Sequence, residues 1–203
     1  MNKILVIPNN LNYLEKLKNK KIDGLIFSIK DLSVNNNLYL TIDDIKKILL
    51  TIDKNIEIWI SLNKIMHNND LELLEHTLIE LDKLKITGVM FYDLSVINIC
   101  KRLNLNLKLS IHEDHLNASI GSNNFYYKQG VDYTVITNDI TLDEILEIKE
   151  DTFGKYVDNI IKRSYHAYKN RQCPSCAVLL SKGKSCIKCP KYHHLIKSGK
   201  NKI

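Results

Sequence analysis

Four cysteines near the C-terminus have the spacing of a metal site. Cys173 and Cys176 form one Cys-x-x-Cys pair, and Cys186 and Cys189 form a second pair nine residues later. Each pair supplies two sulfurs from one tight turn, and four thiolates suit tetrahedral Zn²⁺. Such a zinc ion has no open coordination position, so we expect a structural, zinc-ribbon-like tail, with an iron–sulfur cluster as the alternative. The fifth cysteine, Cys100, lies on an apolar helix face and is expected to be an inert thiol.

Positive charge is concentrated in the same C-terminal segment. The chain carries a net charge of +6, which divides into −5 for residues 1–154 and +11 for residues 155–203. Cations interleaved with tyrosines suit the phosphates and bases of single-stranded RNA. The candidate RNA contacts are Arg163, Lys169, Arg171, Lys182, Lys184 and Lys188. The alternative is a tail that only increases solubility.

A second group of polar residues follows the predicted strands. It consists of Asn63, Asp93, His112, Glu113 and Asp139. Ligands of parallel βα folds bind at the carboxyl ends of the strands, so we treat these five residues as candidate catalytic groups. A histidine beside carboxylates can perform acid–base chemistry or bind a divalent metal. The alternative is that strand ends are polar because they meet solvent, with Asp93 and Asp139 capping the helices that follow.

Strand-like and helix-like segments alternate through the first three quarters of the chain. Strands are predicted at 3–8, 22–28, 55–63, 88–93, 107–111 and 133–136. Capping boxes are predicted for the helices after Thr41, Asn69 and Thr141. The pattern predicts an α/β fold, a short TIM-like barrel with about six βα units. A complete barrel usually needs about 250 residues, so we expect this one to be incomplete.

One turn recurs along the chain. Residues 21–27 and 85–91 share Lys, Ile, Gly and Phe at equivalent positions, and residues 130–135 form a looser copy. Each copy lies between a helix and the next strand. A turn repeated at intervals is what a closed or nearly closed βα barrel would produce.

Two regions follow from these patterns. Residues 1–154 are predicted to form the barrel-like domain, and residues 155–203 a basic helix with the four-cysteine tail. Residues 156–161 fit either a seventh strand or a helix that runs on to Tyr168, and the helix is preferred. An open sheet edge needs a cover, for which a protein partner or a homodimer is the expected source.

The composition of the chain indicates where the protein is expected to be located. The chain is 44% apolar and 26% charged, and no apolar run approaches the roughly 20 residues of a membrane span. The apolar run at the N-terminus is too short for a signal peptide, so we expect a cytoplasmic protein without a membrane partner. The sequence has no Gly-rich phosphate loop, Ser-His-Asp order or His-Glu-x-x-His motif.

Three segments resemble the collagenase-like peptidase family U32. Residues 61–72 are similar to the family's strand that ends in Asn before a "His-Asn, acidic-Leu-Glu" helix start. Residues 88–96 are similar to its next strand, which ends in Asp, and residues 130–145 resemble its "Gly-Val…, Arg-Glu-Leu-Ser-Leu-Glu-Glu-Ile" segment. The resemblance covers roughly residues 3–150 and implies a barrel-like βα fold.

The resemblance also implies two kinds of activity. Some U32 members are described as proteases, and others support oxygen-independent hydroxylation of RNA or a quinone with an iron–sulfur cluster held by four cysteines. This chain differs from the family pattern at Asp139, which with Asn138 replaces Arg-Glu, at residues 112–115, and in the downstream cysteine region. Two hypotheses follow: a divergent U32 enzyme, either a peptidase or an RNA- or cofactor-modifying enzyme, or a non-catalytic zinc-ribbon protein that binds RNA or a partner.

Overall fold

The structure is a computed structural model that describes residues 3–17, 20–34, 36–112, 117–136, 144, 147–148 and 155–157. The chain divides into two compact units, residues 1–157 and residues 158–203. Every element below belongs to the first unit. The second unit, with the four predicted metal-binding cysteines and the six candidate RNA contacts, lies outside the described residues.

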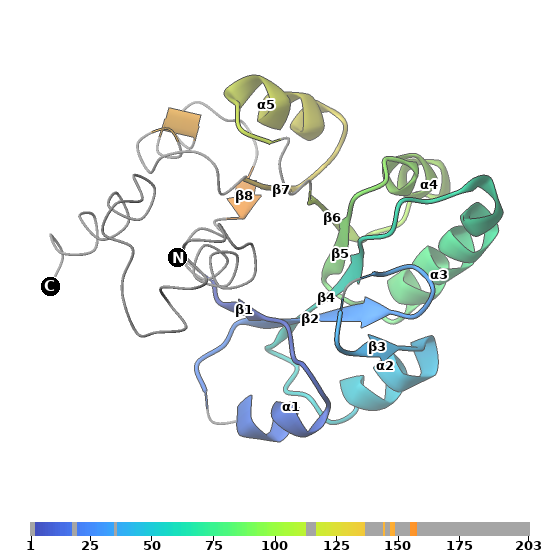
Figure 1. The fold of residues 1–203 in the computed structure, drawn as a ribbon, viewed down its shortest axis with the longest axis vertical. Helices are drawn as coiled ribbons and strands as arrows, with labels where there is room; N and C mark the ends of the chain where they lie inside the picture. The colour runs from blue at the N-terminus through green and yellow to red at the C-terminus, as the bar shows by residue number, and fades with distance from the viewer. Residues whose placement is uncertain are drawn as a thin grey trace, which may run out of the picture. The chain divides into compact units, whose positions relative to one another are not determined.

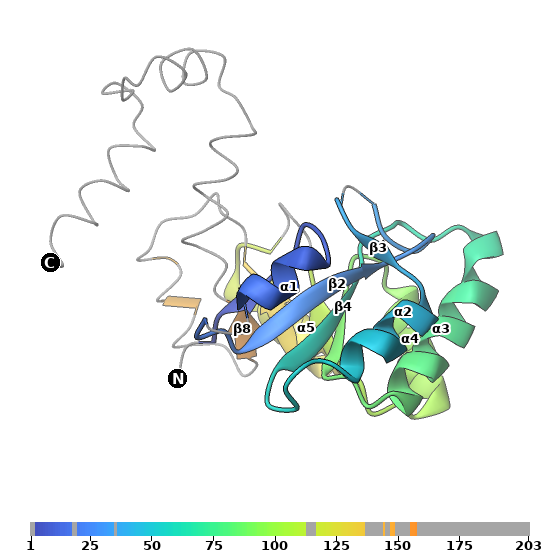
Figure 2. The same cartoon turned by 90° about the horizontal axis from the view of Figure 1, so that it is seen from below.

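Seven parallel strands follow one another in chain order across a single sheet. They are β1 (Leu5–Val6), β2 (Gly24–Ile29), β4 (Glu57–Leu62), β5 (Gly88–Phe91), β6 (Lys108–Ile111), β7 (Tyr133–Val135) and β8 (Lys155–Val157). A short extra strand, β3 (Tyr39–Leu40), pairs in parallel with the end of β2 (Figure 2). The six predicted strands are therefore confirmed, and β3 and β8 are additional.

The preferred helix at residues 156–161 is wrong where the structure describes it. Lys155–Val157 is a strand whose register with β7 runs from Tyr133↔Lys155 to Val135↔Val157. A free edge of β7 offers unpaired backbone groups, and pairing with this edge outweighs a local helical pattern. The rest of that predicted helix lies outside the described residues.

Five α-helices with described bounds connect the strands. They are α1 (Asn12–Leu17), α2 (Ile42–Leu49), α3 (Leu71–Lys83), α4 (Ser95–Leu103) and α5 (Ile120–Lys128), and a 3₁₀ turn, η1 (Asn68–Asp70), leads into α3. The strands follow an arc, and the helices lie on its outer side (Figure 1). The fold is thus a curled parallel sheet that forms a half-barrel, as expected for an incomplete TIM-like barrel. No helix within the described ranges combines the length and apolar composition needed to cross a membrane.

The two faces of the sheet bury different amounts of apolar surface. On β2, Leu25, Phe27 and Ile29 belong to the large core under the helices, whereas Ile26 belongs to a smaller cluster. Side chains alternate between faces along a strand, so the smaller cluster lies on the concave face. Its buried members are Ile26, Trp59, Met90 and Val135.

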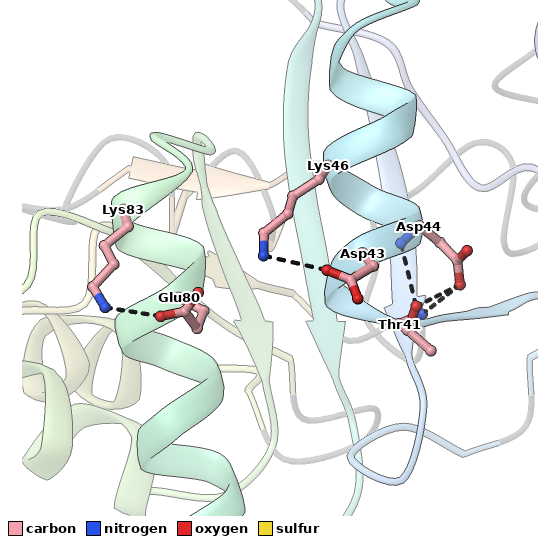
Figure 3. A network of polar contacts seen from close by, with 6 residues as sticks. All are labelled: Thr41, Asp43, Asp44, Lys46, Glu80 and Lys83. Carbon is pink, nitrogen blue, oxygen red and sulfur yellow. Dashed lines mark hydrogen bonds and ion pairs between the residues drawn. The ribbon is translucent and has the colours of Figure 1, made fainter.

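Local signals start the helices where the chain leaves a strand. Thr41 caps α2 in the predicted capping box, with the Asp44 amide donating to Thr41 Oγ1 at 3.2 Å (Figure 3). Exposed i,i+3 ion pairs on α2 and α3, shown in the same view, add little stability.

The cap predicted at Asn69 is wrong. The 3₁₀ turn brings the helix start one residue further, to Asp70, which lies at the N-cap of α3. The Asp70 carboxylate accepts instead from the His67 amide at 3.0 Å and from Lys64 Nζ at 2.8 Å. At the far end of α5, Gly130 has a left-handed conformation, with φ of +82°.

The recurring turn makes the same pair of hydrogen bonds at all three of its copies. One residue of the turn donates its backbone N–H to the carbonyl of a residue at the preceding strand, and its side chain accepts from the amide of that same residue. Asp23 makes this pair with Ile4, Thr87 with Ile58, and Asp132 with Leu109, with side-chain bonds of 2.7, 3.0 and 2.8 Å. The sequence repeat therefore marks one device that fixes successive strands at their amino ends.

A glycine in the second copy allows side chains to meet across the concave face. A Cβ on Gly88 would lie 2.8 Å from Trp59 Cζ3 and closer still to the Lys108 carbonyl oxygen. The Trp59 ring therefore passes over β5 and meets Tyr133 of β7 in a T-shaped contact, with ring centroids 5.4 Å apart. This contact spans three strand-to-strand steps, which requires the sheet to be strongly curled.

Candidate functional site at the carboxyl ends of the strands

Asn63 follows β4 and holds the loop that follows β2. Its Oδ1 accepts from the Val34 amide at 2.8 Å, and its Nδ2 donates to the Val34 carbonyl at 3.0 Å. The neighbouring Ser33 is buried and reinforces this join, because its Oγ accepts from the Ile29 amide at 3.1 Å and donates to the Ser61 carbonyl. Both polar ends of Asn63 are therefore engaged with backbone.

Asp93 holds two other segments. Its Oδ1 accepts from the Ser95 amide at 2.9 Å, and its Oδ2 accepts from the Met66 amide at 3.0 Å. Burial alone raises the pKa of the Asp93 carboxyl, but hydrogen bonds from the Ser95 side chain and from the Ser95 and Met66 amides outweigh it and hold the pKa below its ordinary value. The N-cap of α4 is Leu94 rather than Asp93, but the Asp93 carboxylate still accepts from the Ser95 amide at the helix start. The same side chain also fixes the loop between β4 and α3.

His112 lies directly after β6, in a less accessible place. The residue is 4% exposed, and its backbone N–H donates to the Phe91 carbonyl at 2.8 Å. The imidazole meets the ring of Tyr92 edge to face, with centroids 5.3 Å apart. Since Ile111 belongs to the core under the helices, His112 faces the concave side. Glu113 and Asp139, the other two candidate catalytic residues, lie outside the described residues.

The described side chains of the first unit do not support metal ligation. Among the residues that the structure describes, no group of three or more His, Cys, Asp or Glu side chains is placed to hold a metal ion. Cys100 is buried, and burial followed by the charge of Asp82 raises the pKa of its thiol to about 12. The thiol is therefore inert at neutral pH, as expected, and the zinc prediction rests on cysteines of the second unit.

The sequence analysis missed a buried polar network behind β7. Asn117 Nδ2 donates to Asn123 Oδ1 at 3.1 Å and to the Val135 carbonyl at 3.3 Å, and Thr134 Oγ1 also donates to Asn123 Oδ1. Asn123 in turn donates to the Ser119 carbonyl at 2.7 Å. The network ties the segment before α5 to β7. Nothing in an Asn-rich sequence distinguishes these two asparagines from exposed ones.

Surface clefts lie on the outer side of the sheet. A cleft of about 360 Å³ between α3 and α4 is lined by Leu71, Glu72, Glu75, Ser95, Asn98, Ile99 and Arg102. A smaller hollow of about 140 Å³ lies between α4 and α5. Neither cleft includes any of the predicted site residues, so the candidate site remains the concave face and the strand ends.

Comparisons with known proteins agree with this architecture. The solved structure entitled "The Structure of the U32 Peptidase Mk0906" matches with a TM-score of 0.63 at 14% sequence identity, over 77% of this chain and 67% of that chain. At this identity the likeness shows a shared fold. No curated protein matches the chain. The model of "Peptidase family U32" matches residues 9–192, which is most of the sequence, and the chain therefore belongs to peptidase family U32.

Proposed function

We propose that this chain is a catalytic member of family U32 that hydrolyses a polypeptide, with its reacting groups on the concave face near the ends of β5 and β6. Membership of a family named for peptidases and a fold shared with a U32 peptidase support this proposal. Carboxyl ends of parallel strands are where βα barrels place their catalytic groups.

The observation that carries the proposal is the position of His112. Asn63 and Asp93 use their polar atoms to hold backbone, which makes them positioning residues for the loops. His112 lies buried on the concave face against Tyr92. An imidazole can accept a proton from an attacking water and return it to a departing amine near neutral pH. Glu113 and Asp139 remain candidate partners for that proton transfer.

Fluorescently labelled gelatin, incubated with the full chain, tests this assignment. His112→Asn is expected to lower the rate of peptide release roughly 100-fold or more, because general acid–base catalysis contributes about that much. His76→Asn is the matched control, since His76 is exposed on α3 and lies in neither strand nor rim. Full activity of His112→Asn would contradict the role of His112, and a wild-type chain without activity would contradict the peptidase proposal.

A second candidate function is an accessory role in which the C-terminal segment binds RNA. The specific observation in its favour is the charge distribution, −5 for residues 1–154 against +11 for residues 155–203. In this role the half-barrel is a scaffold, and a protein partner or second copy covers its open edge.

Charge reversal in the full chain separates the two roles. Replacing Lys182, Lys184 and Lys188 with Glu is expected to abolish binding of single-stranded RNA and to flatten its salt dependence, because each lost phosphate contact lowers the slope. The matched control reverses Lys46, Lys47 and Lys83, which lie exposed on α2 and α3. Equal loss of binding in both triple variants would mean that the C-terminal segment is not the RNA site.

Metal analysis of protein purified without air tests the four cysteines. One zinc per chain and a colourless solution would support the structural Zn²⁺ held by Cys173, Cys176, Cys186 and Cys189. Iron with sulfide and a brown colour would instead support the alternative iron–sulfur cluster and a hydroxylation-type enzyme. Protein without any metal would contradict both assignments.

A further inference from the structure

Three serines lie in one register row across the sheet. Ser28 of β2 is opposite Ser61 of β4, Ser61 is opposite Met90 of β5, and Met90 is opposite Ser110 of β6. The next position in the row is Tyr133 of β7. We call Ser28, Ser61 and Ser110 the hydroxyl row.

All three serines face the concave side. Ser28 stands between Phe27 and Ile29, and both of these neighbours belong to the core under the helices. The same holds for the residues that flank Ser61 and Ser110 in β4 and β6. Because side chains alternate along a strand, each serine points away from the helices.

An apolar floor lies on the amino-terminal side of the hydroxyl row. Ile26 and Trp59 precede Ser28 and Ser61 by two residues on the same face of their strands. Trp59 passes over Gly88 and contacts Tyr133, so this layer is filled by side chains, as barrel interiors are. A ligand on the concave face therefore meets the hydroxyl row before it can meet the floor.

The buried hydroxyl of Ser110 is a second, independent observation that indicates a ligand. The residue is 0% exposed, and its Oγ has no hydrogen-bond partner within the described part of the chain. A buried hydroxyl without a partner destabilises a protein, and such groups are rare in native structures. An alanine would fit the same space without that cost. The hydroxyl is therefore explained if a group outside the chain completes its hydrogen bond.

We infer that the hydroxyl row binds the peptide group of a polypeptide substrate, with Ser110 as its innermost contact. A peptide group offers one donor and one acceptor and carries no charge, and the hydroxyl row offers neutral donors and acceptors. The row from Ser28 to Tyr133 contains no charged side chain. Ser61, which is partly exposed at the centre of the row, provides the point of entry. The choice of a peptide rests on the proposed function.

N-acetylglycine N-methylamide, a minimal peptide-group mimic, tests this site in the full chain. Titration followed by ¹H–¹⁵N NMR is expected to shift the backbone amide signals of Ser28, Ser61 and Ser110. Ser110→Ala is expected to abolish these shifts while leaving the melting temperature unchanged or higher. Ser95→Ala is the matched control, because it also removes a buried hydroxyl but lies at the start of α4 beside the outer cleft.

The outcomes separate this inference from the proposed function. Unchanged shifts in Ser110→Ala, or shifts confined to other residues in the wild-type chain, would overturn the inference. If gelatin is cleaved and Ser110→Ala retains the full wild-type rate, the inference fails while the peptidase proposal stands. If the mimic binds at the row but gelatin is not cleaved, the row is a peptide-binding site and the peptidase proposal fails.

Discussion

The two edges of the half-barrel use polar side chains in different ways. At the amino edge, Asp23, Thr87 and Asp132 repeat one pair of hydrogen bonds at three places along the sheet. At the carboxyl edge no such repeat is found among the described residues. Asn63 holds one loop, Asp93 holds a loop and a helix start, and His112 packs against an aromatic ring.

This difference shows how repetition and irregularity should be interpreted in a βα fold. A device that recurs at alternate strand junctions solves a problem that these junctions share, namely the register of one strand with the next. A polar residue that does not recur along the sheet has a role at one place only. Function is therefore to be sought among the irregular residues, of which His112 is buried on the concave face.

Placing a methyl group on Gly88 is expected to have the largest effect. Gly88→Ala would put a Cβ against the Lys108 carbonyl and 2.8 Å from Trp59 Cζ3, so β5 and β6 would have to separate. We expect a loss of about 3–5 kcal/mol in the free energy of unfolding, measured by urea denaturation.

Gly121→Ala is the control for that variant. The nearest atom to its Cβ is Ser119 Oγ at 3.8 Å, and alanine favours the helix in which it lies. Equal destabilisation of both variants would mean that the close approach of Gly88 to Lys108 and Trp59 does not cause the loss of stability.

Removing the carboxylate of Asp93 is expected to cost less. Asp93→Ala leaves the Met66 and Ser95 amides without their acceptor, for an expected loss of about 2–3 kcal/mol. The pKa of Asp93 is lowered in the folded chain, so its contribution is complete above the ordinary value of 3.8 and disappears as pH falls through the folded pKa. Urea denaturation at a series of pH values from about 5 to about 2.5, a range that brackets the ordinary pKa of Asp93, measures this loss of stability.

Asp93→Asn sharpens the same prediction. The wild-type chain should lose stability more steeply than Asp93→Asn as acid is added below about pH 4, because only the wild type has this carboxylate to protonate. If stability falls equally with pH in the two proteins, the charge of the Asp93 carboxylate does not stabilise the carboxyl edge.

Removing one copy of the repeated turn bond is expected to have the smallest effect. Thr87→Val keeps the shape of the side chain but leaves the Ile58 amide without its 3.0 Å acceptor, for an expected loss of about 1–2 kcal/mol. Thr87→Ser restores the hydroxyl and should recover most of that loss. If serine is no better than valine, the hydrogen bond is not what the recurring turn contributes.

Local sequence signals predicted most of this fold. Thr41 acts within a few residues of its own position, so its capping box is confirmed. The helix preferred over a strand at residues 156–161 is wrong at 155–157 because the strand's partner, β7, lies some twenty residues earlier in the chain. The cap predicted at Asn69 is wrong because the His67–Asp70 turn competes for the same residues.

The candidate site was less predictable for a related reason. A strand-end position indicates which edge a side chain occupies, but it does not reveal which backbone amides lie nearby. Asn63 and Asp93 are bound to groups 27–29 residues distant in the chain. The orphan hydroxyl of Ser110 depends on what surrounds it on neighbouring strands, and an isolated serine in a strand carries no local mark of that kind.

The contact between Trp59 and Tyr133 makes the curl of this sheet observable by light. Trp59 is the single tryptophan in the chain, and its ring meets Tyr133 from β7. Its indole N–H also donates to Glu57 at 3.3 Å. Intrinsic fluorescence excited at the indole therefore reports the approach of β4 to β7. A refolding trace followed by this emission would time the moment at which the sheet bends.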